Sequence, residues 1–175
     1  KKLDPLDIDL VIVATITPDM HATATAAYVA SEIGASNAFA FDISAACSGF
    51  LYGMSTASAF IESGRYKKII LIGADKMSSI VDYSDRNTCI IFGDGAGAVL
   101  LEADNEGYGV QDEYLRSNGS NRDLLRIEAG GSQIPTTKQT VEEKQHFIYQ
   151  DGKNVFKHAV SNMSDASDQI MKRNN

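Results

Sequence analysis

Three short apolar segments alternate with two segments of helical composition in the first half of the chain, and this alternation restricts the possible folds most. Residues 9–15, 38–43 and 68–74 are rich in Val, Ile, Leu and Phe and have the length of buried strands. Residues 23–33 and 48–63 lie between them, and a glycine follows each, as is common after a helix. This order predicts parallel strands joined by right-handed crossovers, and therefore a layered α/β fold.

The glycine-rich segment 93–97, Gly-Asp-Gly-Ala-Gly, is superficially like a loop that binds a dinucleotide phosphate. Such a loop needs a strand before it and a helix after it. Here residues 88–92 and 98–102 on the two sides both have strand composition. We therefore predict a tight glycine turn between two strands, with residues 109–114 as the next strand candidate.

The C-terminal third combines a polar segment with an amphipathic one. Residues 117–147 are polar and mixed in charge, which predicts a long loop with little regular structure. Residues 153–171 carry apolar side chains at helical spacing, and Asp151 is placed to cap the helix that this spacing predicts.

Composition and charge exclude several classes of protein. Of the 175 residues, 43% are hydrophobic and 22% charged, which is typical of a globular protein that can bury one good core. A net charge of −7 argues against a nucleic-acid partner, because binding phosphates requires basic patches. No apolar run approaches the roughly 20 residues that a membrane span needs, and the first residues lack the apolar core of a signal peptide. A cytoplasmic protein without a membrane partner is expected.

Cys47 is the candidate nucleophile, because it lies where the strand 38–43 turns into the helix 48–63. The N-terminus of a helix carries partial positive charge and unpaired N–H groups, which favour a thiolate and can bind an oxyanion. Small neighbours would let a thioester approach the sulfur: Ser44, Ala45, Ala46 and Gly49. The alternative is that Cys47 is simply a small buried residue.

The other residues that could carry chemistry have weaker support. Cys89 lies in an apolar run and is expected to be a small buried hydrophobe. The two cysteines have neither the spacing of metal ligands nor the density of a disulfide framework, so we expect both to be reduced and no metal to be bound. His21, His146 and His158 are expected to be surface or structural residues. For Asp42 we expect a structural role, in which its carboxylate accepts bonds from turn N–H groups.

Three sequence motifs in this order resemble the condensing enzymes of the thiolase superfamily, and most closely the β-ketoacyl-acyl carrier protein synthase III family. They are Asp42-Ile-Ser-Ala-Ala-Cys-Ser-Gly-Phe50, Phe92-Gly-Asp-Gly-Ala-Gly-Ala98 and Asn154-Val-Phe-Lys157. Matching elements run from about residue 7 to about residue 172, and the family's enzymes are roughly twice as long.

The fold implied by this resemblance is a thiolase-like layered α/β/α arrangement with a mixed, mostly parallel sheet. Residues 1–116 would be an incomplete N-terminal half of that fold. Residues 117–150 would be a loop or linker region, and residues 151–175 the opening helix of the C-terminal half. The resemblance also implies a homodimer, in which the strand 38–43 pairs with its twin.

The activity implied by the resemblance is the initiation of fatty-acid synthesis. An acyl group passes from acyl-CoA to Cys47, and malonyl-acyl carrier protein then decarboxylates and condenses with it to give 3-oxoacyl-acyl carrier protein. Coenzyme A is a substrate here, and neither a resident cofactor nor a metal is implied. The family's catalytic histidine and asparagine motifs belong to its C-terminal half and do not occur in this sequence. We therefore do not expect the chain alone to complete the condensation.

Further site residues come from the resemblance alone, by matching positions. The implied coenzyme A contacts are Arg86, which would pack on the adenine, and Gly152 and Phe156 near the pantetheine. The implied acyl-pocket residues are Phe92, Met77, Leu124, Ile148 and Ala22. At Ala22-Thr23 the family often has a Phe-Pro pair, which closes the acyl pocket of the partner subunit. The smaller side chain suggests a longer or branched acyl primer.

Three alternatives remain open from the sequence. A polyketide-type synthase of secondary metabolism would share the same motifs, and trials of primers and extenders would separate the two. The chain could also be a catalytically incomplete structural or interaction fragment, which an acylation test on Cys47 would address. A cysteine-dependent hydrolase also starts from a nucleophile between a strand and a helix, and fast thioester turnover would indicate it.

Overall fold

The computed structural model describes residues 3–174, and the chain divides into two compact units. The first unit consists of Lys1–Asp75 and Gly95–Glu113, and the second of Lys76–Asp94 and Tyr114–Asn175. Within the described part of the chain, none of the helices combines the length and apolar character that crossing a membrane requires.

The first unit is built on a four-stranded sheet with the order β2-β1-β3-β4. Its strands are β1 (Leu10–Ala14), β2 (Phe39–Ile43), β3 (Lys68–Asp75) and β4 (Gly95–Glu102). The first three are parallel, as the alternation of apolar and helical segments predicts, and β4 pairs antiparallel to β3. The expected α/β class with a mixed, mostly parallel sheet is thus confirmed.

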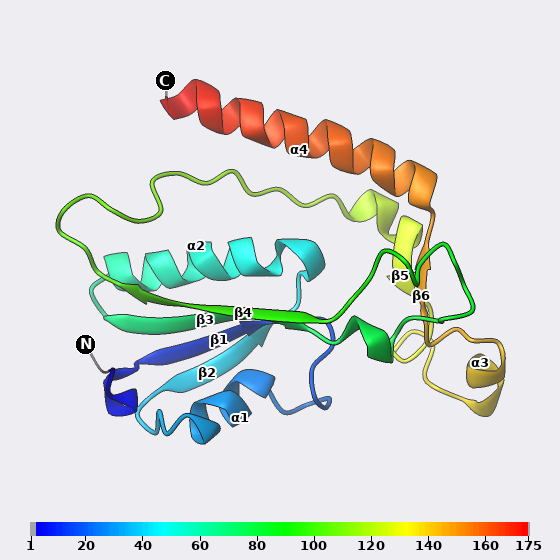
Figure 1. Cartoon of the computed structure of the whole chain (residues 1–175), viewed down its shortest axis with the longest axis horizontal. Coiled ribbons are helices and arrows are strands. Elements are labelled where there is room, and N and C mark those ends of the chain that lie inside the picture. Colours follow the sequence, from blue (N-terminus) through cyan, green and yellow to red (C-terminus); the bar gives the residue numbers. More distant parts are fainter. Residues whose placement is uncertain (1–2, 175) are drawn as a thin grey trace. The chain divides into compact units, whose positions relative to one another are not determined.

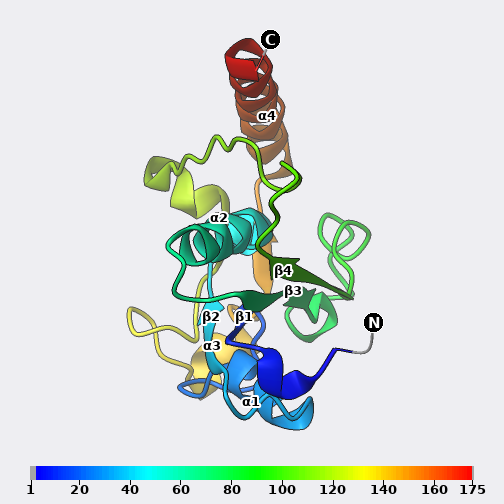
Figure 2. The ribbon, with the colours of Figure 1, turned by 90° about the vertical axis from the view of Figure 1, so that its left-hand side faces the viewer.

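Two helices cover opposite faces of this sheet, α1 (Thr25–Glu32) and α2 (Gly49–Glu62) (Figures 1 and 2). All five residues of β1 are buried, because the strand lies at the centre of the sheet between the two helical layers. Successive side chains of β1 alternate between the layers. Val11 and Val13 join Ala26 and Ala30 of α1, whereas Leu10 and Ile12 join Ala57 of α2.

The glycine-rich segment 93–97 was wrongly predicted as a turn. Residues 95–97 are the first part of β4, and they pair with residues 73–75 of β3. Residues 88–92 form turns rather than a strand, because the carbonyl of Asp85 accepts the Cys89 N–H and the carbonyl of Thr88 accepts the Ile91 N–H. Residues 109–114 also form no strand.

The second unit contains more regular structure than its polar sequence predicts. Its elements are η3 (Met77–Ser79), η4 (Gly119–Leu124), β5 (Leu125–Ile127), α3 (Lys138–Glu142), β6 (Ile148–Gln150) and α4 (Gly152–Asn174). The expectation of a largely irregular loop over residues 117–147 is therefore wrong. Pairing between β5 and β6 and a capping box formed by Thr137 and Thr140 at the start of α3 organise this segment.

The predicted C-terminal helix is confirmed as α4. Asp151 precedes it, and its carboxylate accepts bonds from the backbone N–H and the side-chain amide of Asn154, at 3.2 and 2.7 Å. The bonds from Asn154 lower the pKa of Asp151, because they stabilise the carboxylate. The expected cap is therefore present.

Candidate functional site

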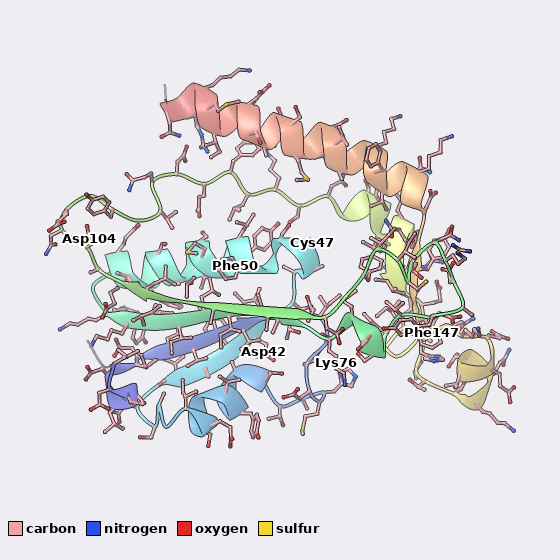
Figure 3. All side chains as sticks on the ribbon, in the orientation of Figure 1. Asp42, Cys47, Phe50, Lys76, Asp104 and Phe147 are labelled. Atoms are coloured by element: carbon pink, nitrogen blue, oxygen red, sulfur yellow. The ribbon has the colours of Figure 1, made fainter. Side chains whose placement is uncertain are left out.

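Cys47 lies in the turn between β2 and α2, with an exposed side chain. The short 3-10 helix η2 (Ala46–Ser48) carries it directly into α2 at Gly49, and Figure 3 shows the residue at the start of α2. Ala46, immediately before it, has a φ of +46°, a left-handed conformation that non-glycine residues seldom adopt. Backbone strain of this kind is concentrated at functional sites. The thiol is therefore accessible and lies on a sharp strand-to-helix turn.

Close packing sets the position of this turn, because two glycines bring α2 down onto the sheet. A Cβ atom added to Gly49 would lie 3.1 Å from the Cβ of Ala14, at the end of β1. One turn further along, a Cβ atom on Gly53 would lie 2.4 Å from a methyl group of Leu71. The N-terminus of α2, with its partial positive charge, is thereby held at the carboxyl edge of the sheet beside Cys47.

The loop after β1 leaves the same edge, and Asp75 at the end of β3 organises it. One carboxylate oxygen of Asp75 accepts bonds from the Thr15 hydroxyl (3.1 Å), the Ile16 N–H (2.9 Å) and the Thr17 hydroxyl (3.1 Å). Ala22 lies further along this loop, is exposed and has a φ of +74°. Because β1 and β2 are parallel neighbours, the loops that carry Ala22 and Cys47 leave adjacent strand ends.

Asp42 has the structural role expected from the sequence, and the N–H groups that it binds belong to α1. Its two carboxylate oxygens accept bonds from the backbone N–H groups of Thr25 and Ala26, each at 2.8 Å. The residue at the N-cap position, Ala24, has no side-chain oxygen for this purpose. A carboxylate from the neighbouring strand therefore caps the helix.

Replacing Asp42 with alanine is expected to destabilise the chain by about 1–2 kcal/mol, because the first N–H groups of α1 lose their acceptor. Urea denaturation followed by circular dichroism measures this loss. Asp4→Ala is the matched control, since Asp4 caps the three-residue η1 (Pro5–Asp7) in an exposed position. Equal destabilisation by the two variants would contradict the assignment.

The remaining predicted site residues lie in the second unit. Met77 and Ile148 are buried, and Leu124 and Phe92 are half-buried. The Ile148 N–H donates to the Ile80 carbonyl at 2.8 Å, so β6 is joined to the chain shortly after Met77. The Asp151 N–H donates to the Leu124 carbonyl at 2.8 Å, which brings Leu124 beside the start of α4.

The three predicted coenzyme A contacts are exposed. They are Arg86 in the loop after η3, Gly152 at the start of α4, and Phe156 one turn later with 70% of its surface exposed. Gly152 and Phe156 share the first turns of one helix.

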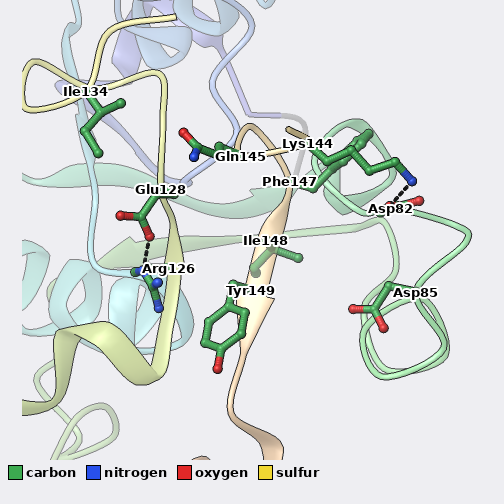
Figure 4. Close-up of a pocket in the computed structure, with 10 residues that line it drawn as sticks. All are labelled: Asp82, Asp85, Arg126, Glu128, Ile134, Lys144, Gln145, Phe147, Ile148 and Tyr149. Carbon is green, nitrogen blue, oxygen red and sulfur yellow. Dashed lines mark hydrogen bonds and ion pairs between the residues drawn. The ribbon is translucent and has the colours of Figure 1, made fainter. Parts of the chain in front are cut away.

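A cavity of about 480 Å³ in the second unit adds residues that sequence reasoning missed. Ile148 and Phe147 line it together with five charged side chains, those of Asp82, Asp85, Lys144, Arg126 and Glu128 (Figure 4). Figure 4 shows four of them as two ion pairs, Lys144 with Asp82 and Arg126 with Glu128. The Arg126 guanidinium also lies 4.6 Å from the ring centre of Tyr149.

Asp82 is the most perturbed carboxyl group of this cavity. Its pKa is lowered to about 2, first by the bond from the Lys144 ammonium and then by bonds from Ser84. The pattern of an aspartate two residues before Ser84 is typical of an Asx turn and could have been found in the sequence. The partner could not, because Lys144 lies 62 residues further along the chain.

The histidines and Cys89 have surroundings that differ from one another. His21 and His158 are exposed, as expected of surface residues. The ring of His146 contacts that of Phe147, with ring centres 4.1 Å apart and the planes tilted by 40°, and the buried Nδ1 of His146 has no hydrogen-bond partner within residues 3–174. Cys89 is half-buried in the turns that replace the predicted strand, and both cysteines are free thiols.

Comparison with known proteins gives consistent matches. Residues 41–119 match the family model described as 3-oxoacyl-[acyl-carrier-protein] synthase III. The β-ketoacyl-[acyl-carrier-protein] synthase III of Chlorobium chlorochromatii is 56% identical, over 100% of this chain and 54% of that protein. The chain thus spans about half the length of the curated relatives that it matches.

The chain also matches solved structures over about half of their length. The 3-oxoacyl-[acyl-carrier-protein] synthase III of Aquifex aeolicus is similar with a TM-score of 0.83 and 36% identity, over 97% of this chain and 50% of that one. The priming β-ketosynthase of the R1128 polyketide biosynthetic pathway has a TM-score of 0.79 and 32% identity, over 94% of this chain and 48% of that one. The expected thiolase-like fold is confirmed for the half that the chain spans.

Proposed function

Because the chain belongs to the β-ketoacyl-acyl carrier protein synthase III family, whose members it matches over about half their length, we propose that it carries the acyl-transfer step of an acyltransferase. Cys47 is the nucleophile of this step. Its thiolate attacks the thioester carbon of an acyl-CoA, and the bond from that carbon to the coenzyme A sulfur breaks. The acyl group stays on Cys47, and the proton that Cys47 gives up ends on the coenzyme A thiol.

The exposed position of Cys47 on a strained turn at the start of α2 is the observation that carries this proposal. The partial positive charge of the helix end stabilises a thiolate and the oxyanion of the tetrahedral adduct. The Cys47 N–H is itself a suitable donor to that oxyanion. Small residues before and after the thiol leave room for a thioester.

In the complete reaction, malonyl-acyl carrier protein loses CO2, and the resulting carbanion attacks the acyl group on Cys47. The product is 3-oxoacyl-acyl carrier protein, and the Cys47 thiolate is regenerated. We propose that this takes place in a cytoplasmic homodimer and initiates fatty-acid synthesis. The proposed coenzyme A contacts are Arg86, Gly152 and Phe156, and the proposed acyl-pocket residues are Phe92, Met77, Leu124, Ile148 and Ala22. We also propose that the chain divides into residues 1–116 of the N-terminal half, a linker region of residues 117–150, and the opening helix of the C-terminal half in residues 151–175.

Incubation with acetyl-CoA followed by mass spectrometry of the intact chain tests the first step. We expect one acetyl group per chain, located by digestion on the peptide that contains Cys47. An unmodified chain, or modification at another residue, would contradict the proposal. Continuous release of acetate without an accumulated adduct would indicate a thioesterase instead.

A second candidate is the priming synthase of a polyketide pathway, which the similarity to the R1128 priming β-ketosynthase favours. The small side chain of Ala22 agrees with a bulkier primer than acetyl. Acylation rates with acetyl-CoA, isobutyryl-CoA and hexanoyl-CoA separate the two candidates. Strict preference for acetyl-CoA would support fatty-acid initiation, and preference for a longer or branched donor would support the polyketide role.

A further inference from the structure

Arg86 lies in a loop, residues 82–88, that is closed by two successive Asx turns. The Asp82 carboxylate accepts bonds from the Ser84 N–H and hydroxyl, at 2.9 and 2.7 Å. The Asp85 carboxylate accepts bonds from the Asn87 N–H and from the hydroxyl of Thr88, each at 3.0 Å. Thr88 is buried and ties the end of the loop down. We call this segment the arginine loop.

Lys144 approaches the arginine loop from the end of α3. The Gln145 N–H donates to the Thr140 carbonyl at 2.9 Å, and the Lys144 N–H donates to the Val141 carbonyl at 3.0 Å. These two bonds define a Schellman motif, in which the residue at the position of Lys144 has positive φ and is usually glycine. Lys144 has a φ of +60°. A lysine at this position costs about 1 kcal/mol of backbone energy that a glycine would avoid.

The side chain of Lys144 explains why a lysine suits this position. Its ammonium group lies 2.7 Å from a carboxylate oxygen of Asp82 and 3.0 Å from the hydroxyl oxygen of Ser84. The Lys144 ammonium therefore binds the first and the last residue of the Asx turn formed by residues 82–84. Within residues 3–174, the Arg86 guanidinium has no hydrogen-bond or ion-pair partner, so it is free to bind a ligand.

We propose that Lys144 is a positioning residue that holds the arginine loop in place, so that Arg86 is ready to contact the adenine and phosphates of a coenzyme A thioester. This inference rests on the role of Arg86 in the proposed function. A loop that is ordered before binding loses less conformational entropy when the ligand binds. Loss of the Lys144 ammonium therefore weakens coenzyme A binding and leaves the chemistry of Cys47 unchanged.

Lys144→Gly is the decisive variant, because glycine suits a φ of +60° and relieves the backbone. The variant is expected to fold at least as stably as the wild type. Its dissociation constant for coenzyme A, measured by calorimetry, is expected to rise about fivefold, the effect of losing an exposed ion pair together with loop order. The amides of residues 82–89 should exchange hydrogen faster even without ligand. Lys144→Arg should keep most of the affinity.

Lys138→Met is the matched control, because Lys138 makes an exposed pair with Glu142 on α3, with 91% of its side chain exposed. It should bind coenzyme A as the wild type does. The KM for acetyl-CoA should rise in Lys144→Gly, with the acylation rate at saturation unchanged. Wild-type affinity and wild-type amide exchange in Lys144→Gly would overturn the inference and leave the proposed function intact. A wild-type chain that neither binds coenzyme A nor is acylated would overturn both.

Discussion

Acylation of the chain by acetyl-CoA is expected to fall by a factor of about 10⁴ or more when Cys47 is replaced with alanine. The reaction needs a nucleophile that forms the new thioester, and alanine provides none. The residue is exposed and lies in η2, so the smaller side chain leaves no cavity in the core. Thermal stability should therefore be unchanged. The rate of acetyl incorporation, followed by mass spectrometry, measures the loss.

Two further variants make this result specific. Cys89→Ala is the matched control, because it removes the other free thiol and should leave acylation at the wild-type rate. Cys47→Ser keeps the shape of the side chain, but its hydroxyl is almost entirely protonated near neutral pH, so slow or no acylation is expected. Incorporation that persists in Cys47→Ala and disappears in Cys89→Ala would move the nucleophile to Cys89.

Replacing Gly53 with valine is expected to destabilise the chain by about 2–4 kcal/mol. Even a single added carbon would lie 2.4 Å from a methyl group of Leu71, which is fully buried. Either Leu71 leaves its rotamer or α2 moves off the sheet. For a chain of this length, the melting temperature should fall by about 5–15 °C.

Ala59→Val on the same helix separates the clash from the preference of valine for strands. Ala59 is exposed, so this variant introduces the same branched side chain without a contact in the core, and a change of less than about 1 kcal/mol is expected. In a double-mutant cycle, Leu71→Ala should relieve part of the cost of Gly53→Val. If the two changes in the free energy of unfolding are strictly additive, the side chain at position 53 does not clash with Leu71.

Sequence patterns were most informative where a buried strand or an amphipathic helix produces a periodic signal. The three parallel strands and the helices α1, α2 and α4 were predicted close to their observed bounds. The predictions failed at residues 88–97, where the choice between turn and strand depends on distant pairing. Residues 95–97 belong to a strand only because residues 73–75 offer their backbone groups to pair with.

The candidate site was likewise predictable from the sequence only in part. The position of Cys47 at the start of a helix followed from the change of pattern after residue 43, and the coenzyme A and acyl-pocket residues came from resemblance and remain proposals. The bond between Lys144 and Asp82 left no signal, since the two residues are 62 positions apart and each has an ordinary local sequence. Asp42 was expected to be structural, but the helix that it caps became clear only from the structure.

The sequence by itself determined the α/β class, the parallel central strands and the thiol at the start of α2, because periodic burial and glycine placement are local properties of the chain. Tertiary structure alone decided which side chains meet across long separations. Asp75 organises the loop after β1, and Lys144 holds the arginine loop, because folding brings together polar groups that no local pattern pairs. Hydrogen bonds and ion pairs depend on distance in space, which sequence spacing does not give.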